Sequence, residues 1–220
     1  VKKASKENRE LFKEFHSSIV HHLVEKDGQY PAVQVMNHAL KAGDRMKRNA
    51  TLFGLKAMNG SIQKFAWVET LDVINKLENA ELHETGDPSS NHQITYGKAK
   101  ALRGIGGHHQ DVRDLLEPIL SSPHIPSFDL FYTYLENEYN VREFEFLVQQ
   151  IDTLEKEGTF QNPLVAVLAQ FYKIIIPTKL PNLEIIALLE PLQTELKNIT
   201  VSENDIRNRD SLLSMAIQES

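Results

Sequence analysis

Apolar residues recur every three or four positions along most of the chain, a pattern that predicts amphipathic helices. In the clearest segment, Trp67, Leu71, Ile74 and Leu77 fall on one helical face, and charged residues fall on the opposite face. Runs that alternate with the period of a strand are rare. The pattern predicts helices at residues 8–25, 30–42, 51–58, 65–79, 94–103, 111–120, 128–137, 142–157, 164–175 and 183–197, and a last one capped by Ser202. The chain is therefore expected to be all-α.

Glycine, proline and polar residues separate the predicted helices. Short turns are expected at 27–28, 59–60, 104–107, 139–140 and 177–181, and longer ones at 41–44, 85–91, 121–127 and 157–162. This alternation of tight and loose turns is typical of stacked helical hairpins. Asn49, which follows the first longer turn, and the residues that end the other three, Asn91, Ser127 and Asn162, are 42, 36 and 35 residues apart, within the range of helix-pair repeats. The spacing predicts a single repeat domain over 1–220, an α-solenoid of about five stacked antiparallel hairpins, with units 8–48, 49–91, 92–126, 127–161 and 162–200 and a terminal helix 202–220.

A short internal repeat supports this period. The sequence Leu-Leu-Glu-Pro-Ile at 115–119 returns as Leu-Leu-Glu-Pro-Leu at 188–192, 73 residues later, which is about two units. In both segments a proline, Pro118 or Pro191, is expected to end or kink the helix because it lacks the backbone N–H. A four-helix bundle or an irregular all-α domain is the alternative architecture.

The third unit resembles a pentatricopeptide repeat. The resemblance rests on Gln-Ile-Thr-Tyr-Gly-Lys-Ala-Lys-Ala-Leu at 93–102, the following Gly106 and Gly107, and the helix from Asp111. Residues 49–52 with the helix at 65–79, and the unit end at 41–43, are similar more loosely. The resemblance spans about 8–197. Tetratricopeptide repeats share the hairpin and nearly the same length, and several units fit either family.

The pentatricopeptide resemblance implies an α-solenoid that binds single-stranded RNA in an organelle, usually a mitochondrion or chloroplast. In such repeats a polar side chain just after the Thr-Tyr pair reads a base edge. The corresponding positions here hold Gly97, Phe53 and Phe131, whose side chains cannot form a hydrogen bond with a base. The two phenylalanines could stack on bases instead, although core packing is the commoner role of such aromatics.

Composition excludes several classes of protein. The chain has 220 residues, of which 41% are hydrophobic and 25% charged, as in ordinary globular domains. No apolar run approaches the length of a membrane helix. The clearest candidate, 171–176, contains Lys173 and ends before Pro177, so no membrane span is expected. Without cysteine there is no disulfide, thiolate metal site or cysteine nucleophile. No secretory signal is visible in the residues after Val1. The sequence alone does not define the true ends of the chain or any targeting segment.

Charge changes along the sequence. Residues 1–48 carry a net charge of +4, residues 49–126 of −2 and residues 127–220 of −8. A polyanion would therefore meet the N-terminal third, and a basic partner the C-terminal half. The candidate RNA or polyanion contacts are the basic residues Lys41, Arg45, Lys47, Arg48, Lys56, Lys98, Lys100 and Arg103.

Catalytic and metal-binding patterns are weak. His16 is spaced from His21 and His22 by intervals that do not share a helical face, and the adjacent His108 and His109 point apart. The carboxylates at 136, 138, 143 and 145 lie in a stretch expected to be exposed, which does not favour acid–base chemistry. Residues 104–107 lack the strand and the Lys-Ser/Thr of a phosphate-binding loop. We therefore expect no enzyme activity, no metal and no cofactor.

Two functions follow from the sequence. The first is a non-enzymatic pentatricopeptide-like module in organellar (mitochondrial) RNA metabolism or translation, bound to single-stranded RNA or a ribonucleoprotein. The alternative is a tetratricopeptide-like protein scaffold or adaptor, cytoplasmic if not mitochondrial, whose acidic C-terminal half meets a basic protein partner. For the protein interface the candidates are Tyr134, expected on the outside of its helix, and the neighbouring Glu136 and Glu143.

Overall fold

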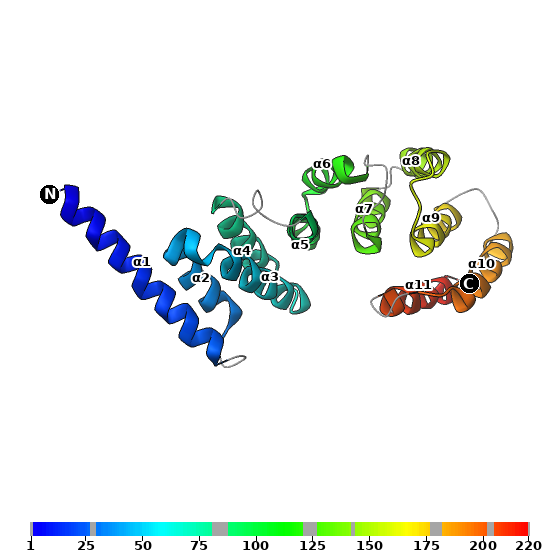
Figure 1. The fold of residues 1–220 in the computed structure, drawn as a ribbon. Helices are drawn as coiled ribbons and strands as arrows, with labels where there is room; N and C mark the ends of the chain where they lie inside the picture. Colours follow the sequence, from blue (N-terminus) through cyan, green and yellow to red (C-terminus); the bar gives the residue numbers. More distant parts are fainter. Residues whose placement is uncertain are drawn as a thin grey trace. The chain divides into compact units, whose positions relative to one another are not determined.

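The computed structural model describes residues 2–26, 30–80, 88–120, 127–141, 144–176, 182–201 and 205–219. All regular elements in these ranges are helical, which confirms the all-α prediction (Figure 1). They are α1 (Lys2–Glu25), α2 (Ala32–Ala42), the 3-10 helix η1 (Gly43–Met46), α3 (Lys47–Gln63), α4 (Trp67–Asn79), α5 (Pro88–Ile105), α6 (His109–Leu120), α7 (Phe128–Val141), α8 (Phe144–Lys156), α9 (Pro163–Ile175), α10 (Asn182–Asn198) and α11 (Ile206–Gln218).

Each predicted helix coincides with an observed one, but two predicted turns are wrong. The turn expected at 59–60 lies inside α3, and the one at 139–140 lies inside α7. Gly60 costs its helix about 1 kcal/mol relative to alanine, and the burial of Met58 and Ile62 on either side of it outweighs that cost. The expected cap at Ser202 lies outside the described residues.

The end of α3 falls instead at Phe65, whose backbone has a φ of 56°. Its N–H donates to the carbonyl of Ile62 at 3.0 Å, and the N–H of Ala66 donates to the carbonyl of Ser61 at 2.9 Å. This pair of bonds is a Schellman motif, which normally has glycine at the left-handed position. A phenylalanine is strained there, and its side chain is 74% exposed.

The chain forms two compact units, residues 1–107 and 108–220. In the first, consecutive helices from α1 to α5 pack against one another, and α5 also contacts α3. Glycines allow two close approaches: a Cβ atom on Gly54 would lie 2.6 Å from Leu77 Cδ2, and one on Gly104 would lie 2.3 Å from Trp67 Cε2. The core includes Val20, Met36, Ala39, Met58, Ile74, Leu77 and Ile94.

The second unit contains α6 to α11. Here α7 contacts α6, α8 and α9, and α9 contacts α10 and α11. Asn162 caps α9, since its Oδ1 accepts from the N–H of Leu164 at 2.9 Å, with Pro163 at the first helical position. Pro191 does not end its helix, because α10 continues to Asn198. Pro118 lies two residues before the end of α6.

Candidate functional site

The predicted basic residues lie on four elements of the first unit. Lys41 is on α2 and Arg45 on η1, and the others are Lys47, Arg48 and Lys56 on α3 and Lys98, Lys100 and Arg103 on α5. Among them Lys41, Arg45, Arg48 and Lys56 are exposed, and the other four are half-buried. The structure therefore distributes them over four elements and does not gather them into one cluster by direct contact.

Several of these cations already contact groups of this chain. Arg45 lies 3.4 Å from Glu10 and 3.5 Å from Glu14 on α1, and Lys47 lies 3.2 Å from Asp44. The remaining contacts are between Lys98 and Glu78 at 2.8 Å, Lys100 and the Tyr96 hydroxyl at 2.9 Å, and Lys56 and the Phe53 ring at 5.0 Å. Lys41 and Arg48 form no ion pair with the described residues. Phosphates would have to compete for most of the predicted contacts.

The positions that correspond to base-reading residues are largely covered. A Cβ on Gly97 would lie 2.4 Å from Met58 Sδ, so this position faces the core. Phe131 is 0% exposed and packs against Phe160, with 5.4 Å between ring centroids. Phe131 therefore has the core role that is commoner for such aromatics, and its ring is not available to stack on a base. Phe53 is half-buried under the Lys56 ammonium group.

The interface expected around Tyr134 also needs correction. Tyr134 is 1% exposed, because α7 packs against α6, α8 and α9 and so is buried on more than one face. The prediction that this tyrosine lies on the outside is wrong. Glu136 is half-buried, and its Oε1 accepts from the Tyr132 hydroxyl at 2.6 Å. Glu143 lies outside the described residues.

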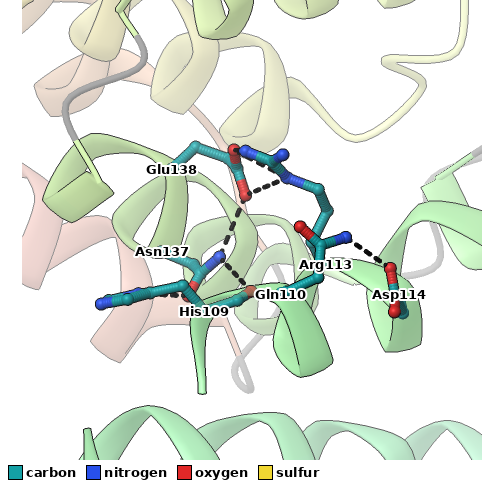
Figure 2. Close-up of polar contacts among 6 residues, drawn as sticks. All are labelled: His109, Gln110, Arg113, Asp114, Asn137 and Glu138. Atoms are coloured by element: carbon teal, nitrogen blue, oxygen red, sulfur yellow. Dashed lines mark hydrogen bonds and ion pairs between the residues drawn. The ribbon is translucent and has the colours of Figure 1, made fainter. Parts of the chain in front are cut away.

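A buried polar network joins α6 to α7 (Figure 2). Glu138 is 0% exposed, contrary to the expectation of an exposed carboxylate, and forms an ion pair with Arg113. Asn137 donates from Nδ2 to Glu138 Oε1 at 3.0 Å and to the His109 carbonyl at 3.1 Å. The Arg113 guanidinium also lies 4.9 Å from the centre of the Phe146 ring on α8. These bonds engage both carboxylate oxygens within the chain, which fits a role in holding three helices together.

The histidines have partners that sequence spacing did not indicate. His16 Nδ1 lies 2.8 Å from His38 Nδ1 on α2, and burial, followed by the nearby His38 and Lys41, lowers the pKa of His16. His108 contacts Asp111 at 2.8 Å, whereas His109 Nδ1 lies 3.1 Å from Asn137 Oδ1. The two adjacent side chains thus have different partners. Over the described ranges, no three His, Asp or Glu side chains are grouped so as to hold a metal ion.

An apolar surface on α1 was missed by the sequence reasoning. Leu11, Phe12 and Phe15 are 63%, 53% and 62% exposed, whereas His16 and Val20 on the adjoining face are buried. The ring of Phe12 lies 4.4 Å from that of His16, so the exposed surface continues directly from the buried one. The sequence does contain a signal for this surface, because the apolar face of this helix is wider than the area that one neighbouring helix can cover.

Acidic residues border this surface. At 100° per residue, Glu7, Glu14 and Glu25 fall on a line beside Leu11 and Phe15. A hollow next to Leu11 is lined by Lys6, Glu7, Glu10, Leu11 and Glu14. Glu10 and Glu14 share Arg45, while Glu7 forms no ion pair with the described residues. We refer to Leu11, Phe12, Phe15 and this acidic border as the α1 surface.

Comparison with known proteins gives no family for the chain. No protein-family model, no curated protein and no solved structure matches it. None of the helices in the described part of the chain combines the length and hydrophobicity that a membrane-spanning segment needs.

Proposed function

We propose that this chain is a non-enzymatic binding module built from helical hairpins, and that its partner is a protein. The observation that carries the proposal is the α1 surface, where two phenylalanines and a leucine are more than half exposed on one helix. Apolar patches of this kind mark protein contacts more often than they mark RNA contacts, because aromatic anchors gain most when a partner excludes water.

The chemistry of the α1 surface supports a basic amphipathic helix as the partner. Leu11 and Phe15 are four residues apart, which presents a ridge along α1 that a second helix can pack against. Glu7 and Glu14 border the ridge on one side, so lysine or arginine beside the partner's apolar stripe would complete the contact. A membrane surface with anionic lipids would meet the same glutamates unfavourably.

Three synthetic helical peptides test this. Two share the same apolar stripe, with lysine and arginine beside it in the first and glutamate in the second. The third has the basic border of the first, but serine replaces its apolar stripe. Fluorescence anisotropy should show the full chain binding the first at least tenfold more tightly than the others. The Leu11→Ser/Phe15→Ser variant should lose about 2 kcal/mol, or about 30-fold in affinity.

A matched control uses other exposed apolar residues of the same unit. Phe65 and Val68 are 74% and 70% exposed, and the Phe65→Ser/Val68→Ser variant should bind the basic peptide as the wild type does. Equal binding of the basic and acidic peptides, or equal losses in both double variants, would contradict the proposal. Sedimentation equilibrium covers the remaining case: a wild-type dimer that Leu11→Ser/Phe15→Ser dissociates would assign the α1 surface to a second copy of this chain instead.

Single-stranded RNA is a second candidate ligand, in the organellar role that the repeat resemblance implies. Its support from the structure is the pair Lys41 and Arg48, which are exposed and form no ion pair with the described residues. The first unit also has 16 Lys and Arg against 12 Asp and Glu, a net charge of +4, whereas the second has 8 against 18, a net charge of −10. Any RNA contact would therefore involve the first unit.

A further inference from the structure

A pocket of about 220 Å³ lies between α7, α9 and α11 in the second unit. Its walls hold four aromatic rings and two carboxylates, and none of the described residues that line it is basic. The lining residues are Tyr132, Glu136, Tyr139, Asn140, Phe171, Tyr172, Ile175, Met215, Gln218 and Glu219. This composition differs from that of an ordinary surface hollow in pairing large aromatic walls with negative charge.

One wall belongs to α7. Tyr132, Glu136 and Tyr139 follow each other at steps of four and three, so they share a helical face. The Tyr132 hydroxyl donates to Glu136 Oε1 at 2.6 Å and lies 3.9 Å from Met215 Sδ on α11. Glu136 Oε2 is shielded from solvent. The carboxylate is thus oriented by a tyrosine that itself contacts a second helix.

Three of the pocket rings form two edge-to-face pairs that share Tyr172. Tyr139 and Tyr172 have centroids 5.9 Å apart and ring planes at 81°, and Phe171 and Tyr172 have centroids 5.7 Å apart at 86°. Phe171 and Tyr172 are 2% and 4% exposed, so packing fixes their orientation. Perpendicular rings present π faces and edges from several directions, an arrangement that can surround a small cation.

The lysine nearest in sequence to the pocket residues forms its ion pairs outside the pocket. Lys173 follows Tyr172, but its Nζ lies 2.6 Å from Asp152 and 3.2 Å from Glu155, both on α8. The pocket carboxylates Glu136 and Glu219 therefore do not use this ammonium group. A cationic ligand would find negative charge and aromatic faces at the same place.

We infer that this pocket binds an organic cation with an alkylated ammonium group, such as trimethylammonium. One water molecule occupies about 30 Å³, so the pocket matches a group of several heavy atoms and is small for a drug-sized ligand. An alkylated ammonium is more weakly hydrated than the compact ammonium of lysine, and it gains from cation–π contact with the rings. The inference is independent of the proposed function, because the pocket and the α1 surface belong to different units.

Isothermal titration of the full chain with choline tests the inference, with the neutral isostere 3,3-dimethylbutan-1-ol as the comparison. Choline should bind at least tenfold more tightly than the alcohol, since only choline carries the charge. Glu136→Gln and Tyr139→Leu should each weaken choline binding by about tenfold. Glu145→Gln, which removes an exposed carboxylate of α8 outside the pocket, is the matched control and should leave the affinity unchanged.

A second variant, Glu219→Gln, covers the case in which Glu136→Gln disturbs packing. Glu219 is exposed at the end of α11, so its substitution should not affect the fold. This variant should weaken choline binding while the thermal unfolding curve stays that of the wild type. Equal affinity for choline and the alcohol, no heat of binding with choline, or unchanged binding in both glutamine variants would overturn the inference.

A peptide with one trimethyllysine, compared with the same peptide carrying unmodified lysine, identifies the source of the cation. Tighter binding of the methylated peptide than of choline would support a side chain of a partner protein as the ligand. Choline binding as tightly as the methylated peptide would support a free small molecule. Tighter binding of the unmodified peptide than of the methylated one would contradict the assignment to alkylated ammonium.

Discussion

Arg113 on α6 forms an ion pair with the fully buried carboxylate of Glu138 on α7. Removal of the arginine alone would leave a buried charge without its counterion, which typically costs about 3 to 5 kcal/mol. We therefore expect Arg113→Met to lower the free energy of unfolding more than the double variant Arg113→Met/Glu138→Leu does. Urea denaturation of the full chain measures both. A double variant less stable than the single one would contradict this, because it would show that Glu138 stabilises the fold even without its counterion.

Substitution of alanine for each of two glycines should have opposite effects on the free energy of unfolding. Gly104→Ala would place a Cβ 2.3 Å from the Trp67 ring, so α4 and α5 must separate and the free energy of unfolding should fall by about 1 to 3 kcal/mol. A Cβ on Gly60 inside α3 would lie within 4 Å of no other atom. Gly60→Ala should therefore raise the free energy of unfolding by about 0.5 to 1 kcal/mol. Thermal unfolding of both variants checks the packing of these helices, and a stabilising Gly104→Ala would contradict it.

The contact between His16 and His38 predicts a loss of stability in acid. The pKa of His16 is lowered from its ordinary 6.5 by burial, by His38 and by Lys41, so the unfolded chain binds a proton more readily than the folded chain does. Stability is fully present above pH 6.5 and declines as the pH falls from there towards the lowered pKa of the folded state. Denaturation curves across this range should show the decline in the wild type and a flatter profile in His16→Gln.

Other charged groups near this contact set the control for that experiment. Lys13, Glu10 and Glu14 on α1 and Arg45 on η1 form ion pairs with one another, whereas Lys41 on α2 acts on His16 directly. Lys41→Gln should reduce the acid sensitivity while keeping both histidines. An identical pH profile in the wild type and His16→Gln would assign the decline to other groups.

If the chain binds single-stranded RNA, the structure predicts which cations contribute. Arg45 and Lys47 contact carboxylates, whereas Lys41 and Arg48 do not. Lys41→Ala/Arg48→Ala should therefore reduce affinity and the salt dependence of binding more than Arg45→Ala/Lys47→Ala does. Filter binding at several salt concentrations measures both quantities. An absence of binding at low salt would contradict the RNA prediction itself.

The helices were predictable because burial of one face leaves a regular trace in the sequence. Even Pro163 after Asn162 at the start of α9, and Gly158 with a φ of 69° after α8, lie where the predicted breaks fall. The turns at 59–60 and 139–140 were wrong because a glycine or asparagine is tolerated within a helix that packs on both sides of it. Local signals of this kind do not record the tertiary contacts that override them.

The candidate sites were much less predictable. Tyr134 was expected outside because one apolar face was assumed, but α7 contacts three other helices. Tyr132, Phe171 and Met215 come from helices far apart in the sequence and meet only in the folded unit. Phe12 and Phe15 carried a usable signal, since an apolar arc too wide for one neighbour predicts an uncovered face.

Hydrogen exchange of the full chain, measured with and without the basic amphipathic peptide, tests the proposed function most directly. Binding at the α1 surface should slow exchange in the part of α1 that contains Leu11 and Phe15, and Leu11→Ser/Phe15→Ser should abolish that protection. Protection confined to other helices, or protection that persists in this variant, would contradict the assignment of the α1 surface to a protein partner.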